Sequence, residues 1–242
     1  MAGPDPRLEA HLTSFASAVT AALGGRVVAV ALYGSAAGRD WVAGHSDVNT
    51  AIVVDAVTAS VLEALVPLVA RWRSRGFAVP LVIDREYLAR ARDVFPIELD
   101  DIRLQHRLLA GTDVFTELVS TREILRRECE YEARGKLLRL RTMYLVHAES
   151  PETLARMIQR SLTSFLTLMR HFLRVQGGEV APGYDAVVQA AEKVLGPLPA
   201  MRRSLARRQR GDTSVAVDPT REFLAYQSEV ERLVQAVDAL GA

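Results

Sequence analysis

The stretches LYGSAAGRD at 32–40 and HSDVNTAIVV at 45–54 decide the fold of this chain. The first closes the apolar, β-branched run RVVAVALY at 26–33, which ends at Gly34 as a buried strand ends at a tight turn. The second runs into TAIVV at 50–54, another short apolar run that is typical of a buried strand. The sequence therefore predicts two strands that are separated by a turn and a loop.

Polar side chains gather where these two strands meet. The backbone amides after Gly34 and the hydroxyl of Ser35 favour a bound phosphate, because a strand is expected to lead into the start of a helix here. Asp47 and Asn49 precede the second strand, and because strand side chains alternate, both are expected on one face. Oxygen ligands of this kind suit Mg²⁺ and the phosphates of a nucleotide. The pattern indicates metal-assisted phosphoryl or nucleotidyl transfer.

The rest of the chain to residue 118 mixes helices and strands. The spacing of apolar residues predicts helices over 5–23, 58–75 and 103–110, and short apolar runs predict strands over 77–83 and 95–102. Pro80 indicates that the strand over 77–83 is irregular or lies at a sheet edge. We therefore expect an α/β domain over 1–118.

From residue 119 onward the pattern is helical. Apolar residues recur at helical spacing over 121–147, 151–175, 184–195 and 222–240, and no convincing strand remains. The arginines of 202–210 are expected to be solvated, because no aromatic residues are interleaved with them. These features predict an all-α helical bundle over 119–242.

Composition and charge narrow the class of protein. A hydrophobic content of 49% and a charged content of 24% are typical of a compact folded chain. The net charge of +1 is too small to attract nucleic acid or an anionic membrane to the protein as a whole, so the sequence gives no strong indication of nucleic-acid binding. Cys129 is the only cysteine, which excludes an intramolecular disulfide and a cysteine-based zinc site. With no apolar run of about 18 residues and no export signal, we expect a cytoplasmic protein.

Residues 32–54 resemble the nucleotidyltransferase superfamily, whose pattern is Gly-Ser, a spacer, and then Asp, any residue, Asp on the next strand. The whole chain resembles bacterial nucleotidyltransferase-domain proteins with a helical C-terminal half, which are distantly similar to aminoglycoside nucleotidyltransferases. The resemblance implies an α/β (α+β) domain with a small mixed sheet, followed by the helical bundle. It also implies Mg²⁺ with a nucleoside triphosphate, and transfer of a nucleotide to a hydroxyl of a small molecule.

The resemblance also assigns roles to the residues of the motif. It implies that Gly34 and Ser35 hold the nucleotide phosphates, that Asp47 binds the metal, and that Asn49 stands in the place of the second metal-binding aspartate. Asparagine offers one neutral carbonyl oxygen where the pattern has a carboxylate, so it holds a divalent cation less strongly. Two-metal catalysis is therefore not expected to operate in its usual form.

A third carboxylate in the family pattern comes from a later strand and orients or deprotonates the attacking hydroxyl. Glu98 is the candidate for this catalytic role and for an additional metal ligand. Asp100 shares the face of Glu98 if residues 97–102 are extended, and Asp84 is another alternative. The sequence leaves the choice among the three open.

Two further interpretations stay open beside the transferase. Asn49 favours a catalytically degenerate scaffold, one that binds a nucleotide or a partner after losing the second carboxylate. Arg141 and His147 fit the loose pattern of helical ribonuclease-like domains, which predicts a different activity. The acceptor, the nucleotide preference and the oligomeric state, a homo-oligomer included, are not determined by the sequence.

Overall fold

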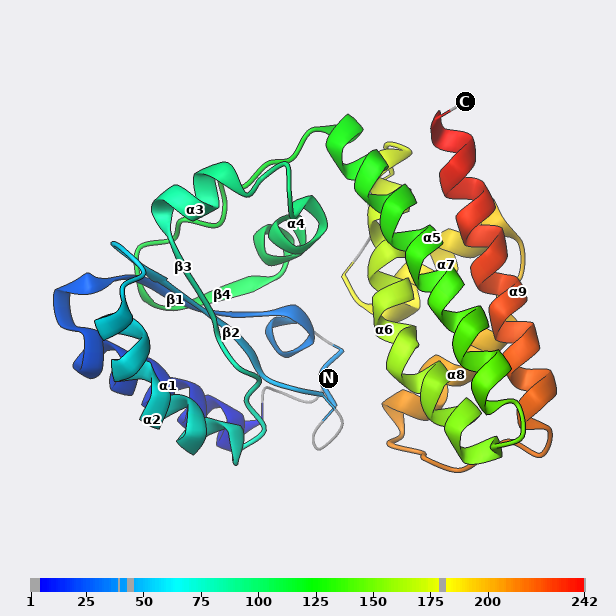
Figure 1. The fold of residues 1–242 in the computed structure, drawn as a ribbon, viewed down its shortest axis with the longest axis horizontal. Coiled ribbons are helices and arrows are strands. Elements are labelled where there is room, and N and C mark those ends of the chain that lie inside the picture. Colours follow the sequence, from blue (N-terminus) through cyan, green and yellow to red (C-terminus); the bar gives the residue numbers. More distant parts are fainter. Residues whose placement is uncertain (1–4, 39, 43–45, 179–181, 242) are drawn as a thin grey trace. The chain divides into compact units, whose positions relative to one another are not determined.

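The fold is taken from a computed structural model that describes residues 5–38, 40–42, 46–178 and 182–241. The chain divides into two compact units, Met1–Ser120 (unit 1) and Thr121–Ala242 (unit 2), and Figure 1 draws both. Within the described ranges, no helix is both long and apolar enough to cross a membrane.

In the described part of unit 1, helices surround a sheet of four strands. The strands are β1 (Val27–Tyr33), β2 (Asn49–Val54), β3 (Leu81–Asp84) and β4 (His106–Gly111). The helices are α1 (Pro6–Leu23), α2 (Ala59–Arg73), α3 (Arg85–Arg90) and α4 (Pro96–Leu104), with short 3₁₀ helices η1 (Gly24–Arg26) and η2 (Gly34–Ala37). The strand order is β3-β2-β1-β4, with β1 antiparallel to β2 and β4 and with β2 parallel to β3. The sheet is small and mixed, as expected.

Helices cover both faces of this sheet (Figure 1). Successive residues of β1 and β2 point to opposite faces, so each of these central strands contributes to two cores. The core under α1 and α2 contains Leu12, Phe15, Val19, Val30, Leu32, Val48, Ile52, Val54, Val61, Trp72 and Phe77. The core under α3 and α4 contains Ala29, Ala31, Ala51, Val53, Leu88, Leu99, Ile102, Phe115 and Leu118. Burial on both faces explains why β1 and β2 are nearly continuous apolar runs in the sequence.

Local sequence signals account for the main boundaries in unit 1. The carboxylate of Asp5 accepts a hydrogen bond from the amide of Arg7 at 2.8 Å and so caps the start of α1. Gly24, with a φ of +59°, ends that helix in a conformation that favours glycine. Strand β3 begins directly after Pro80 and lies at a sheet edge, as predicted from that proline.

The expected order of strand and helix over residues 95–110 is wrong. Residues 96–104 form helix α4, and residues 106–111 form strand β4. Pro96 suits the first turn of a helix, and Arg103 binds Asp100 three residues earlier at 2.7 Å, a pairing that helical geometry brings about. The β4 segment is extended because it pairs with the open side of β1, a partner that a local pattern does not reveal.

Unit 2 is a helical bundle. Its described helices are α5 (Arg122–His147), α6 (Pro151–Val175), α7 (Tyr184–Leu195), α8 (Pro199–Gln209) and α9 (Pro219–Asp238), followed by the 3₁₀ helix η3 (Ala239–Gly241). Helices α5, α6 and α9 pack against one another, and α7 and α8 pack against this group. The core includes Leu154, Leu162, Phe165, Met169, Phe172, Phe223, Tyr226, Val230 and Leu233. Helix α8 was not among the helices predicted from the sequence.

A buried carboxylate joins two helices of unit 2. Glu229 of α9 is 3% exposed, and its two oxygens accept hydrogen bonds from the amides of Ala200 at 2.7 Å and Met201 at 2.8 Å. These amides lie in the first turn of α8, where they have no acceptor within the helix. Burial raises the pKa of Glu229 even though these hydrogen bonds favour its charged form.

Candidate active site

The turn after β1 is the centre of the candidate site. Gly34 has a φ of +72°, which favours glycine, and its amide donates a hydrogen bond to the carbonyl of Gln105 at 3.2 Å. The chain then forms the four-residue 3₁₀ helix η2, and the amide of Gly38 closes it by donating to the carbonyl of Ser35 at 3.1 Å. The expected longer helix is absent from this described turn, so its dipole does not contribute to anion binding.

Asn49 lies next to this glycine. Tyr33 and Asn49 are directly paired in the antiparallel ladder of β1 and β2, so the turn and the start of β2 are adjacent. A Cβ atom added to Gly34 would lie 3.2 Å from Nδ2 of Asn49. Glycine therefore leaves the space that separates the Asn49 side chain from the backbone of the turn.

Asp47 and Asn49 flank a buried residue. Val48 is buried in the core under α1 and α2, whereas Asp47 is exposed and Asn49 is half-buried. Alternation along the extended chain directs Asp47 and Asn49 away from that core, toward the face of the sheet that α3 and α4 cover. The Asn49 side chain thus flanks the turn at Gly34, and Asp47 lies two residues before Asn49 on the same face.

A row of three side chains crosses the sheet beside this turn. Tyr33 pairs with Asn49 on one side and with His106 of β4 on the other, so the three residues share one face. Burial raises the pKa of the Tyr33 phenol, and the nearby charge of Glu98 raises it further. Glu98 of α4 therefore lies within electrostatic reach of the row.

The sequence did not reveal that His106 belongs to this row, because it was expected in a helix. Nδ1 of its ring is 2.9 Å from the carbonyl of Ile102, and Nε2 is 3.1 Å from a carboxylate oxygen of Asp113. Burial opposes ionisation of Asp113, but hydrogen bonds from the Phe115 amide and from His106 outweigh it, and the pKa of Asp113 lies below its usual value. His106 thus ties the end of α4 to β4.

The three candidates for the third carboxylate lie in different environments. Glu98 is exposed in the first turn of α4. Asp100 is buried and paired with Arg103, and in a helix it lies about 200° around the axis from Glu98, so the two do not share a face. Asp84 caps α3 by accepting from the Tyr87 amide at 2.7 Å. Backbone hydrogen bonds to Asp84, from Tyr87 first, lower its pKa.

The residues at the turn suit one hydrated magnesium ion better than two. In the described ranges, no three His, Cys, Asp or Glu side chains are grouped as a metal cluster would require. Mg²⁺ is commonly held by one or two carboxylates together with water and substrate phosphates. The carboxylate of Asp47 and the amide oxygen of Asn49 fit that donor set, provided that the nucleotide supplies the remaining oxygens.

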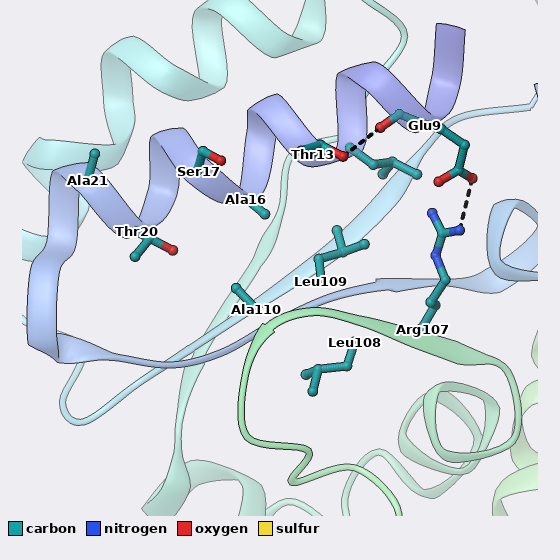
Figure 2. Close-up of a pocket in the computed structure, with 11 residues that line it drawn as sticks. Glu9, Thr13, Ala16, Ser17, Thr20, Ala21, Arg107, Leu108, Leu109 and Ala110 are labelled. Carbon is teal, nitrogen blue, oxygen red and sulfur yellow. Dashed lines mark hydrogen bonds and ion pairs between the residues drawn. The ribbon is translucent and has the colours of Figure 1, made fainter. Parts of the chain in front are cut away.

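A groove of about 700 Å³ lies elsewhere in unit 1, between α1 and β4 (Figure 2). Arg107 of β4 binds Glu9 of α1 at 2.9 Å at one end of this groove, and small residues such as Thr13 and Ser17 line its helical wall. None of the residues predicted for the nucleotide site lines it. The groove is therefore separate from the turn at Gly34.

Several charged residues of unit 2 form ion pairs. The arginines of α8 pair with acids of neighbouring helices, Arg202 with Glu192 and Arg207 with Glu222. Arg141, on which the ribonuclease interpretation depends, binds Glu231 of α9 at 2.8 Å. These pairings leave little of the basic run at 202–210 for a nucleic-acid surface.

Comparison with known proteins places this geometry in a known fold. No family model matches the chain, and no curated protein matches it in sequence. A crystal structure of the spectinomycin adenyltransferase AAD(9) from Enterococcus faecialis with ATP and spectinomycin does match, at a TM-score of 0.57. The sequences are 15% identical, and the match covers 93% of this chain and 98% of the other. The chain therefore has the fold of a nucleotidyltransferase of this kind, an α/β domain followed by a helical domain.

Proposed function

We propose that this protein binds a nucleoside triphosphate with Mg²⁺ at the turn after β1 and transfers the nucleotide to a hydroxyl of a small molecule. The observation that carries the proposal is the adjacency of Gly34 and Asn49 at one end of β1 and β2, on the fold of an adenyltransferase. The AAD(9) structure contains ATP and spectinomycin, so that protein takes a nucleotide and a small-molecule acceptor.

Each residue has a role that its position supports. Gly34 lets a phosphate approach the backbone closely, because it carries no Cβ and has a positive φ. Ser35 adds a hydroxyl donor, and Asp47 supplies the carboxylate for Mg²⁺. When bound, Mg²⁺ would neutralise the phosphate charge that develops during transfer. Asn49 contributes a neutral oxygen to the metal or an amide donor to a phosphate.

Glu98 is the proposed acceptor of the hydroxyl proton. It is exposed, it lies within electrostatic reach of Tyr33, and it forms no ion pair in the described structure. Asp84 and Asp100 are less suited, because a helix cap and a buried ion pair already use their carboxylates. A proton acceptor must lie within hydrogen-bond reach of the acceptor hydroxyl, so this role depends on where the acceptor binds.

The alternative is a scaffold that binds nucleotide without turnover. Asn49 favours it, because an amide neutralises none of the charge of a divalent cation. Among the described residues, Asp47 belongs to no group of three or more Asp, Glu, His or Cys side chains that could hold a metal ion. The two functions share the nucleotide site and differ in whether pyrophosphate is released.

Calorimetric titration of ATP with and without Mg²⁺ tests the nucleotide site. We expect Mg²⁺-dependent binding that is lost in Asp47→Ala and retained in Asp55→Ala. Asp55 is a matched control, because it is an exposed aspartate just beyond the opposite end of β2. If the wild type bound no nucleotide, or if both variants lost binding equally, the proposed site would be wrong.

Pyrophosphate release separates the transferase from the scaffold. An active transferase releases pyrophosphate from ATP when a hydroxyl-bearing acceptor is present, and Glu98→Gln should lower that rate more than it lowers nucleotide affinity. Asn49→Asp should strengthen the Mg²⁺ dependence of binding in both cases. The scaffold would be favoured if ATP bound tightly but no pyrophosphate was released with any acceptor of a screen, in the wild type and in Asn49→Asp alike.

A further inference from the structure

A second hollow lies within unit 2, apart from the residues proposed to bind the nucleotide. It has a volume of about 420 Å³ and lies between α6, α8 and the segment 212–215. Ile158 and Val215 supply apolar surface, and Thr213 and Ser214 bring hydroxyl groups. A volume of this order accommodates a small organic ligand.

Two arginines on this hollow form no ion pair with any described residue. Arg156 and Arg160 lie one turn apart on α6, so their Cβ atoms are about 5–6 Å apart. Nη2 of Arg156 donates a hydrogen bond to the hydroxyl of Thr153 at 3.0 Å, and neither guanidinium forms an ion pair within the described ranges. This differs from Arg207, the third arginine of the hollow, which binds Glu222 at 2.8 Å.

Two carboxylates, Asp212 and Glu152, also line the hollow. The hydroxyl and amide of Ser214 bind Asp212 and, together with the charges of Arg207 and Arg210, hold its pKa below its usual value. Glu152 is exposed in the first turn of α6, where the helix dipole favours a carboxylate. Neither forms an ion pair with Arg156 or Arg160 in the described structure.

We propose that this hollow binds a small organic anion, a phosphomonoester that carries a compact apolar group. Two guanidinium groups one turn apart present planar arrays of donors that match the oxygens of a phosphate. The hydroxyl of Thr213 adds a neutral donor, and Ile158 and Val215 contact the apolar part. A hollow with apolar surface and a few convergent polar groups favours this class over an extended polyanion, which binds along a continuous basic surface.

Calorimetric titration of the full chain with phenyl phosphate tests the proposal. We expect saturable binding of one phenyl phosphate per chain, and weaker binding of inorganic phosphate, which lacks the apolar group. Arg156→Gln and Arg160→Gln should each weaken phenyl phosphate binding about tenfold or more, because each removes charged hydrogen bonds. Both arginines are exposed, so the variants should unfold at the wild-type temperature in circular dichroism.

Arg139→Gln is the matched control. Arg139 is an exposed arginine of α5 that also forms no ion pair in the described structure, but it does not line the hollow. Equal weakening by this control would attribute binding to general surface charge and overturn the proposal. So would the absence of saturable binding, or binding of an oligonucleotide but not of phenyl phosphate.

The proposal stands or falls independently of the nucleotide site. Phenyl phosphate binding should persist in Asp47→Ala, which lacks the carboxylate proposed to hold Mg²⁺ in unit 1. If Asp47→Ala abolished it while Arg156→Gln did not, phenyl phosphate would be bound at the Gly34 turn, and the hollow would not be an anion site.

Discussion

Replacing Gly34 by alanine should destabilise unit 1 and weaken nucleotide binding. Two costs follow from the structure. A non-glycine residue at a φ of +72° pays about 1–2 kcal/mol for the left-handed conformation. The new methyl group would also lie 3.2 Å from Nδ2 of Asn49, closer than most such contacts, and moving that side chain should add about 0.5 kcal/mol or more.

Two comparisons separate these costs. Gly76→Ala has a similar backbone penalty, since Gly76 has a φ of +84°, but its Cβ would meet no atom within 4 Å. Gly34→Ala should therefore cost more than Gly76→Ala by the contact term alone. In the double variant Gly34→Ala/Asn49→Ala the contact is gone, so its free energy of unfolding should be higher than additivity predicts.

Tryptophan fluorescence during urea unfolding measures this effect in unit 1. The only two tryptophans of the chain, Trp41 and Trp72, both lie in unit 1, and Trp72 is buried in the core under α1 and α2. The fluorescence transition thus reports this unit selectively. Additive costs for Gly34 and Asn49 would refute the adjacency on which the site is built, and wild-type stability of Gly34→Ala would refute the positive φ.

Three further predictions follow from other groups. Glu229→Gln leaves one buried backbone amide of α8 facing an NH₂ group, so it should lower the free energy of unfolding of unit 2 by about 1–3 kcal/mol. Thermal unfolding followed by circular dichroism measures this loss. The control Glu231→Gln removes an exposed ion pair with Arg141 and should cost under about 1 kcal/mol. The pKa of Asp113 is lowered in the folded state, so its ionised carboxylate stabilises unit 1 above about pH 4, and this stabilisation is lost as pH falls through the folded-state pKa. In Asp113→Asn, the stability of unit 1 measured by tryptophan fluorescence should therefore fall less between neutral and acidic pH than in the wild type. The exposed pair of Arg107 and Glu9 should contribute about 0–1 kcal/mol, so Arg107→Ala should leave the urea midpoint of unit 1 nearly unchanged.

The sequence allowed the fold class to be predicted because its strongest signals are local. Strands β1 and β2 are buried on both faces and so appear as continuous apolar runs. Helix α6 has the predicted bounds, Pro151 to Val175, because a proline suits its first turn and apolar residues then recur at helical spacing.

The error at residues 95–110 has a different cause. Ile97, Leu99 and Ile102 fit a short strand as well as a helix, because a run this short does not separate the two periods. The outcome depends on non-local contacts, since the open side of β1 pairs with 106–111 and the preceding segment packs as α4 against the sheet. His106 lies in the candidate site because β4 pairs with β1 in the register that places it opposite Tyr33. The local sequence does not reveal that register.

The charge at the Gly34 turn limits what the proposed site binds. Asp47 provides one negative charge and Asn49 none, so these side chains alone leave a divalent cation largely uncompensated. A nucleoside triphosphate brings several anionic oxygens and balances the ion, whereas a site with two aspartates would hold more of the charge itself. Under the proposed function, metal and nucleotide therefore enter as one complex. An asparagine at position 49 would then leave more of the compensation of the metal's charge to the substrate than an aspartate would.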